Sequence, residues 1–257
     1  MISRILSLIF TCGLLSAAEH AGGIRVLCWN LHHGVGEDGK LDLPRIAALI
    51  KAQQPDVVAL QEVDNKCRRS AGVDQAAELA KLTGMGGVFG KAMDHDGGEY
   101  GQAILSKHPI GETKVHRLPG DGEPRIGFEA AVTIGGRPLR MVSVHLDHQQ
   151  DARRLKQAVA LAAALSKSDV PLILAGDFND VPGSPVLKAF GSGWTTMAKK
   201  ELVFTAPASK PTAEIDHILL LGFEARGLLE VVPEAVASDH RPIAGVVVWK
   251  PSSGVSP

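Results

Sequence analysis

Short apolar runs recur along this chain, and polar or turn-forming residues separate them. Runs of this length, rich in β-branched residues and without helical spacing, predict β-strands. The pair Gly135-Gly136 also predicts a hairpin turn between two of them. The predicted strands cover residues 24–29, 56–60, 103–106, 112–118, 128–134, 139–146, 172–175, 215–221, 228–232 and 243–249.

Three other segments have apolar residues three or four positions apart, which is the spacing of an amphipathic helix. The first begins at Asp42, whose side chain can cap a helix, and ends at Pro55. The second covers residues 74–82 and stops at Gly84, and the third covers residues 150–166. The predicted core-facing residues of the third helix are Leu155, Val159, Ala162 and Leu165.

Helices follow some predicted strands and hairpins join others, so the pattern favours an α/β fold with two sheets and helices outside them. The 257 residues contain no internal repeat, and a single domain over residues 24–250 is the simplest interpretation. Hydrophobic residues make up 45% of the chain and charged residues 21%, which excludes a disordered chain. The net charge of −1 argues against a strongly basic nucleic-acid-binding protein, although not against a local basic groove.

The first residues have the pattern of a secretory signal peptide over residues 1–18. Arg4 supplies a positive charge, an apolar run covers residues 5–15, and the small residues 16–18 form a cleavage site. We therefore predict a secreted or periplasmic protein whose mature chain has no transmembrane segment, with an uncleaved anchor as the alternative. Residues 251–257 are predicted to form a flexible tail.

Cysteine usage excludes a disulfide scaffold, because the chain has 3 cysteines in 257 residues. Cleavage of the signal peptide would leave Cys28, in a predicted buried strand, and Cys67, in a predicted loop. We expect two unpaired thiols, although a bond between them stays open in an oxidising compartment.

Polar residues gather where the predicted strands begin or end. Because ligands of α/β proteins collect at strand ends, we expect these side chains to share one site. The candidates at strand ends are Asn30, Glu62, His145, Asp177, Asn179, Asp216, Asp239 and His240.

Three of these candidates suit a hard cation. Glu62 and Asp239 offer carboxylates and Asn30 offers an amide oxygen, which are the ligands that Mg²⁺ prefers. Mn²⁺ or Ca²⁺ could substitute on ligand type alone, and the cysteines lack the spacing of a zinc site. Taken alone, an acid such as Glu62 at a strand end is more often solvated than a metal ligand.

The remaining candidates suit proton transfer. His240 would project beside the metal, and Asp216 can accept a hydrogen bond from its ring and raise its basicity, so the pair could activate water as a general base. His145 could donate to a phosphate oxygen or to the leaving group. Asp177 and Asn179 could orient the nucleophile and stabilise the developing charge, although alone both residue types favour turns.

Six short motifs in a fixed order make the sequence recognisable: Trp29-Asn30, Gln61-Glu62, Ser-Val-His-Leu-Asp at 143–147, Gly-Asp-Phe-Asn at 176–179, Ile-Asp-His at 215–217 and Ser-Asp-His-Arg-Pro at 238–242. Together they resemble the signature of the endonuclease/exonuclease/phosphatase superfamily. These Mg²⁺-dependent phosphoesterases include DNase I-like nucleases and bacterial sphingomyelinases. The resemblance covers residues 24–250, and His217 stands where the family often has tyrosine.

The resemblance implies a four-layer α/β/β/α sandwich of the DNase I type. Two mixed, mainly antiparallel sheets would pack face to face, with helices outside. It implies the same roles for the eight candidates, with Glu62 as the principal metal ligand, Asp216 and His240 as the dyad, and the others around the metal or the scissile phosphate.

We therefore predict a secreted Mg²⁺-dependent phosphodiesterase that acts on a small or lipid-linked phosphodiester. The near-neutral charge and the 4% of aromatic residues leave little for base stacking or for tracking a long phosphate backbone. A secreted DNase I-type endonuclease acting on DNA or RNA is the alternative. A non-catalytic binding module with this fold is a third possibility, and no stable protein partner is evident.

Several neighbouring polar residues are left without a role. His32 is interpreted as a loop histidine and His148 as a structural or exposed one. Tyr100 is equally consistent with packing and with a phosphate contact. The basic loop at residues 66–69 could attract an anion or be solvated, and Arg125 is treated in the same way and is left out of the site.

Overall fold

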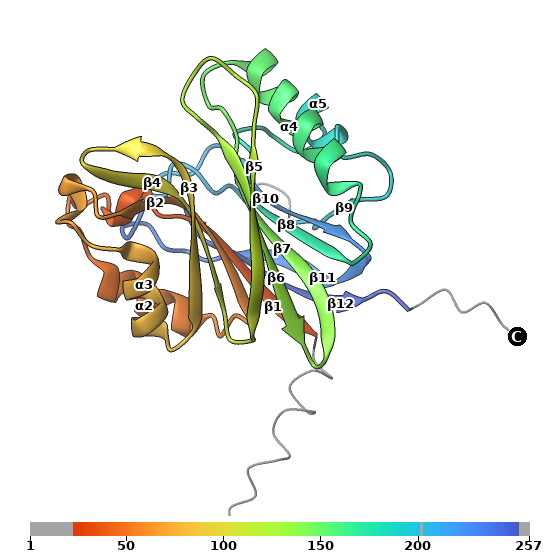
Figure 1. Ribbon diagram of the computed structural model, residues 1–257, viewed down its shortest axis with the longest axis horizontal. Coiled ribbons are helices and arrows are strands. Elements are labelled where there is room, and N and C mark those ends of the chain that lie inside the picture. Colours follow the sequence, from red (N-terminus) through yellow and green to blue (C-terminus); the bar gives the residue numbers. More distant parts are fainter. Residues whose placement is uncertain (1–22, 201–202, 252–257) are drawn as a thin grey trace, which may run out of the picture.

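A computed structural model describes residues 23–200 and 203–251, which form two six-stranded sheets and four α-helices (Figure 1). The first sheet contains, in spatial order, β11 (Phe223–Val231), β12 (Ile243–Trp249), β1 (Ile24–Asn30), β2 (Val57–Asn65), β4 (Gly98–Ser106) and β3 (Gly86–His95). The second sheet contains β5 (Ile110–Arg117), β6 (Ile126–Ile134), β7 (Arg137–His145), β8 (Leu172–Asp177), β10 (Asp216–Leu221) and β9 (Thr195–Thr196).

Each sheet has one parallel pair among antiparallel neighbours. The parallel pairs are β1 with β2 and β7 with β8, and the other neighbouring strands of the described chain are antiparallel. Parallel neighbours need a crossover connection, which is usually a helix. Accordingly, α2 (Leu43–Ala52) joins β1 to β2 and α4 (Asp151–Leu165) joins β7 to β8.

The two sheets pack face to face, and helices cover their outer faces. Strand β1 illustrates this, since Val26 and Cys28 belong to the core between the sheets, whereas Leu27 and Trp29 pack under the helices. Successive side chains of a strand point to opposite faces, so a strand buried on both faces is apolar throughout. The predicted sandwich of four layers is therefore confirmed.

Different helices close the two outer layers. Helices α2 and α3 (Gln75–Thr83) cover the first sheet, and Ile46, Ile50 and Leu79 pack there. Helices α4 and α5 (Pro185–Lys188) cover the second sheet, where Leu161 and Leu165 pack.

Most predicted elements are present with slightly different bounds, and one core assignment was wrong. Val159 is 52% exposed, whereas Ala158 and Leu161 of the same helix are buried. The face of α4 that meets the sheet is therefore rotated by about one position from the predicted stripe. Strands β3 and β9 and the short α5 were not predicted.

Cys28 and Cys67 are both buried and unpaired, as expected. The predicted signal peptide, and all but the first residue of the predicted tail, lie outside the described residues. Within residues 23–200 and 203–251, no helix combines the length and the apolar character needed to cross a membrane.

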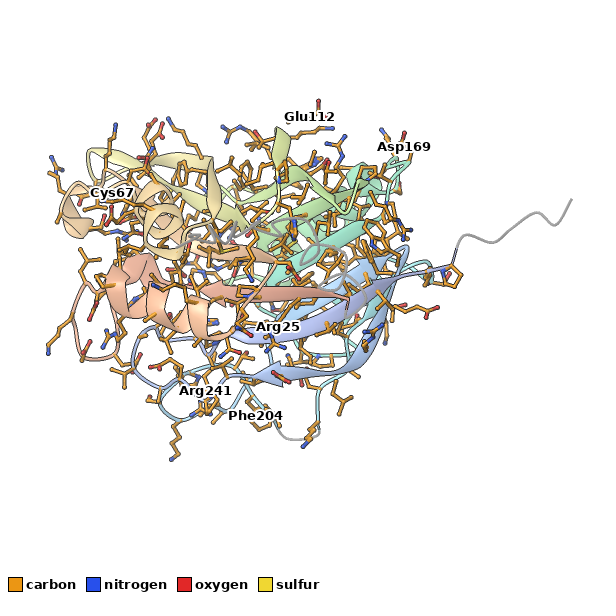
Figure 2. All side chains as sticks on the ribbon, turned by 90° about the horizontal axis from the view of Figure 1, so that it is seen from below. Arg25, Cys67, Glu112, Asp169, Phe204 and Arg241 are labelled. Atoms are coloured by element: carbon orange, nitrogen blue, oxygen red, sulfur yellow. The ribbon has the colours of Figure 1, made fainter. Side chains whose placement is uncertain are left out.

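The carboxyl ends of the parallel strands meet at one end of the molecule. Figure 2 shows Cys67, which follows β2, at the opposite end from Asp169, which precedes β8. The candidate residues lie at the end where β1, β2, β7 and β8 finish.

Candidate active site

Strand register in the second sheet aligns three of the candidates. His145 at the end of β7 is the register partner of Asp177 at the end of β8, and Asp177 is also the partner of Asp216 at the start of β10. Partners on neighbouring strands place their side chains next to one another on one face. Three chain segments that are far apart in sequence thus deliver an imidazole and two carboxylates to one rim.

The first sheet contributes Asn30 and Glu62. Asn30 ends β1 beside Gln61 of β2, and the pairing of β2 with β4 shifts register between Leu60 and Val63. Glu62 lies in this bulge with a φ of 54°, a left-handed conformation that is uncommon for glutamate. Bulges of this kind redirect side chains next to active sites, and here the bulge places Glu62 in the wall of a pocket.

Asn30 connects the two sheets. Its amide nitrogen donates to Glu62 Oε1 at 3.1 Å and to Asp177 Oδ2 at 3.2 Å. Its amide oxygen accepts a hydrogen bond from the main-chain N–H of His32 at 3.1 Å. Asn30 therefore holds a carboxylate of each sheet in place, in addition to being close to the predicted metal position.

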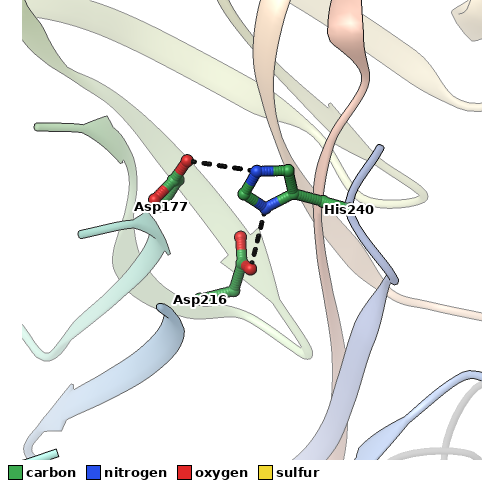
Figure 3. Close-up of side chains that lie close together, drawn as sticks. All are labelled: Asp177, Asp216 and His240. Atoms are coloured by element: carbon green, nitrogen blue, oxygen red, sulfur yellow. Dashed lines mark hydrogen bonds and ion pairs between the residues drawn. The ribbon is translucent and has the colours of Figure 1, made fainter. Parts of the chain in front are cut away.

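His240 lies between two buried carboxylates (Figure 3). Its Nδ1 is 3.0 Å from Asp216 Oδ2, and its Nε2 is 3.7 Å from Asp177 Oδ2. Since an ionised carboxylate only accepts, Nδ1 carries the proton in the first contact. Burial works to lower the pKa of His240, but the carboxylates of Asp216 and Asp177 outweigh it and hold that pKa well above 6.5.

His145 and Asn179 complete the surroundings of Asp177. His145 Nε2 lies 3.5 Å from Asp177 Oδ2, and the main-chain N–H of Asn179 donates to Asp177 Oδ1 at 2.8 Å. Burial, together with nearby Arg125, holds the pKa of His145 well below 6.5, so this ring is neutral at pH 7. Burial raises the pKa of Asp177 from 3.8 to about 7, with His240 opposing the shift.

A pocket of about 420 Å³ brings the candidates together. Asn30 and Asp216 lie directly behind it, bonded to Glu62 and His240 respectively. All eight predicted residues therefore meet at one place in the structure. The pocket is lined by His32, Glu62, Arg69, Met93, His95, Tyr100, Glu123, Arg125, His145, His148, Asp177, Asn179, Asp239 and His240.

Two carboxylates in the pocket have no basic partner. Within the described residues, neither Glu62 nor Asp239 forms an ion pair with Lys, Arg or His; their hydrogen bonds come from Asn30 and Ser238. Burial raises the pKa of Glu62, and the nearby charge of Asp239 raises it further. Partly buried acids that lack a direct ion pair fit a divalent cation, which can supply the balancing charge.

A second group could also hold an ion by distance alone. One ligand atom each from Asp177, Asp216 and His240 lies within 4.8 Å of the other two. This set differs from the predicted ligands Glu62, Asn30 and Asp239. In it, Asp216 and His240 are already hydrogen-bonded to each other, through Asp216 Oδ2 and His240 Nδ1.

Arg125 is a pocket residue that the sequence reasoning left out. Its side chain is 4% exposed, and Nη2 contacts Glu123 at 3.2 Å and His148 at 3.1 Å. Its Nε and Nη1 have no hydrogen-bond partner within the described residues. A buried guanidinium with unused donors suits an anionic ligand. The sequence signal was weak, because Arg125 lies in a loop ahead of β6.

Three more residues outside the predicted set line the pocket. His148 is exposed, as expected, yet it also contacts Arg125. Tyr100 lies in the wall, with its ring under the guanidinium of Arg69 at 5.4 Å. The Nδ1 of His32 is 3.1 Å from the carbonyl of Val35 and must donate to it.

A family model described as "Endonuclease/Exonuclease/phosphatase family" matches residues 27–240, a range that contains all of the candidates. The chain belongs to this family. Its members hydrolyse phosphoester bonds, and the geometry above gives this chain the residue types that such chemistry needs.

Individual relatives in this family are distant. An uncharacterized protein of Escherichia coli (strain K12), YbhP, is 25% identical to this chain over 169 residues. The match covers 61% of this chain and 66% of YbhP, so the chain spans just under two thirds of that relative. The endonuclease/exonuclease/phosphatase of Beutenbergia cavernae is 25% identical with a TM-score of 0.65, covering 88% of this chain and 71% of the other. The mannosyl-6-phosphatase of Bacteroides thetaiotaomicron is 20% identical with a TM-score of 0.73, covering 88% and 100% respectively, and shares the fold.

Proposed function

We propose that this protein is a Mg²⁺-dependent phosphodiesterase that hydrolyses a small or lipid-linked phosphodiester. The observation that carries the proposal is the position of His240, which shares a pocket with the unpaired carboxylates of Glu62 and Asp239 and is bonded to Asp216 behind it. An ion at Glu62 and Asp239 would place positive charge beside the scissile phosphate. Asn30 holds Glu62 and is the third ligand of the proposal.

The dyad supplies the base. His240 Nε2 accepts a proton from water while Nδ1 keeps its bond to Asp216, whose carboxylate stabilises the imidazolium that results. The two flanking carboxylates favour the charged form of His240, so the ring must first lose its Nε2 proton to act as the base; a cation bound at Glu62 and Asp239 would favour that loss by repulsion.

Other side chains act on the phosphate. The unused Nε and Nη1 donors of Arg125 and the neutral ring of His145 suit its non-bridging or leaving oxygens. Asp177 and Asn179 form the adjoining wall of the pocket, where they orient the nucleophile. The pocket of about 420 Å³ falls within the usual size range of small-ligand sites, which a head group would fit.

A substrate panel tests this proposal. The purified protein is incubated with Mg²⁺ and bis-p-nitrophenyl phosphate, phospholipids, inositol phosphates, sugar monophosphates, plasmid DNA and RNA. Hydrolysis of small or lipid diesters that stops with a chelator is the expected result. Efficient nicking of plasmid DNA would instead establish the nuclease alternative, and preference for a monoester would make the protein a phosphatase.

A binding module without chemistry is the remaining alternative. It would be supported by protein that binds Mg²⁺ in calorimetry yet hydrolyses nothing in the panel.

We also propose that the protein is exported, on the basis of the N-terminal sequence pattern alone. Fractionation of producing cells, followed by N-terminal sequencing of the exported form, tests it. A chain that begins after Ala18 outside the cytoplasm is expected, and an intact N-terminus in the cytoplasmic fraction would contradict it.

A further inference from the structure

Lys199 is a buried lysine that the mechanism above does not use. It follows β9, and the main chain just before it is anchored, because Met197 N–H donates to the Ile218 carbonyl at 2.9 Å and Leu229 N–H donates to the Ala198 carbonyl at 2.8 Å. The Lys199 side chain is only 2% exposed. Burying a lysine is costly unless its ammonium is paired, so its partners indicate why it is there.

Both partners of this ammonium belong to the segment that leads into β10. Nζ donates to the main-chain oxygen of Asp216 at 2.6 Å and to Glu214 Oε1 at 3.0 Å. Lys199 therefore fixes the chain at the residue from which the dyad carboxylate projects. Because strand ends fray more easily than strand centres, a clamp at the first residue of β10 has a direct effect on where Asp216 points.

Charge gives Lys199 a second effect on Asp216. Asp216 is 1% exposed, and its Oδ1 has no hydrogen bond of normal geometry within the described residues, although the Thr205 side chain lies near enough to lower the pKa of Asp216. The cationic groups that favour its ionised form are His240 and Lys199. Its other titratable neighbours, Asp177 and Cys28, become anions when they ionise, and the charge of Asp216 raises the pKa of each. A buried carboxylate with one lone pair unused depends on nearby positive charge to stay ionised.

We propose that Lys199 is a positioning residue for the dyad. Its ammonium holds the main chain of Asp216 in register, and its positive charge balances the Asp216 carboxylate where that carboxylate faces His240. This inference rests on the proposed function for the role of the dyad. The contacts of Lys199 are independent of any metal ion.

The test compares Lys199→Met with Lys199→Arg, and uses Lys200→Met as the matched control because Lys200 is the adjacent, exposed lysine. One readout is kcat and KM for bis-p-nitrophenyl phosphate. The other is the downfield proton NMR signal of His240 Nδ1–H, which reports its hydrogen bond to Asp216. We expect Lys199→Met to lose at least tenfold in kcat with little change in KM, and to shift or broaden the Nδ1–H signal. Lys199→Arg should recover much of both, and Lys200→Met should match the wild type.

The outcomes are distinct. A folded Lys199→Met protein with wild-type kcat and an unchanged Nδ1–H signal overturns the inference. If Lys199→Met does not fold, Lys199→Gln removes the charge but keeps a side-chain donor, and an unchanged kcat and Nδ1–H signal in that variant overturns the inference equally. If the wild type hydrolyses no phosphoester, the proposed function fails, but the NMR comparison still decides whether Lys199 positions Asp216.

Discussion

Asp177 and Asp216 are register partners on the antiparallel strands β8 and β10, and the ring of His240 lies between their carboxylates, 3.7 Å from one and 3.0 Å from the other. The two acids are in different states. The pKa of Asp216 is held below 3.8 because the charge and hydrogen bond of His240 outweigh its burial, whereas burial dominates at Asp177 and raises the pKa to about 7. One buried acid is thus committed to the imidazole, and the other can share a proton with the pocket.

We expect the dyad to act as a unit. His240→Asn or Asp216→Asn should lower kcat by about 10²–10⁴-fold, the usual contribution of a general base. The double variant should be little worse than either single variant, because each removes the same proton transfer. Steady-state kinetics of the three proteins, with circular dichroism to confirm folding, measures this. Losses that multiply in the double variant would show that the two residues act independently.

Glu62→Gln should abolish metal binding without unfolding the protein. Glutamine keeps the shape and the acceptor for Asn30, and it removes a carboxylate whose ionisation is disfavoured by burial. The metal-free variant should therefore be at least as stable as the wild type at pH 8. Mg²⁺ at 100 times its Kd should stabilise the wild type by about 2.7 kcal/mol and the variant by much less.

Thermal melts with chelator and with Mg²⁺ measure that difference. Glu37→Gln is the control, because Glu37 is exposed and lies outside the pocket lining. If Mg²⁺ stabilises Glu62→Gln as much as the wild type, the ion binds at another site. The cluster of Asp177, Asp216 and His240 would then be the next candidate.

The metal-free protein should lose stability as pH rises from about 4 to about 7. Burial raises the pKa of Asp177 from 3.8 to about 7, so in this window the folded chain keeps a proton that the unfolded chain has released. Stability falls with pH wherever the folded state binds more protons than the unfolded state.

Denaturant unfolding at pH 5, 6, 7 and 8 in the presence of chelator measures this slope. Asp177→Asn cannot ionise and should give a shallower decline than the wild type. Identical slopes for the two proteins would mean that Asp177 is already ionised in the folded state.

Elements with strong local signals were predictable from the sequence. Asp42 caps α2 by accepting from Arg45 N–H at 2.9 Å, and Gly84 ends α3 with a φ of 75°, as their residue types predict. Strand β3 has no such signal, because glycines interrupt its apolar residues. Gly90 lets the Phe128 ring of the facing sheet pack against the backbone of β3, since a Cβ at this position would lie 2.3 Å from that ring.

The site was predictable in its membership but not in its geometry. Motif order identified Glu62, but the bulge that gives it a φ of 54° depends on pairing with β4, which is a long-range contact. Arg125 and Lys199 were missed for the same reason. Their roles rest on burial and on partners that tertiary packing supplies, and neither lies in a motif.

Arg125→Lys should weaken substrate binding more than it lowers turnover. The guanidinium has Nε and Nη1 without a partner within the described residues while Nη2 is engaged by Glu123 and His148, and a lysine ammonium cannot reproduce this planar fork. We expect KM for bis-p-nitrophenyl phosphate to rise by about tenfold, which corresponds to about 1.4 kcal/mol of lost binding. The inhibition constant of inorganic phosphate, tested as a competitive inhibitor, should rise by a similar factor. Arg125 would instead be a structural residue if the variant keeps both constants and loses only thermal stability, since the unused donors would then serve the fold and not the ligand.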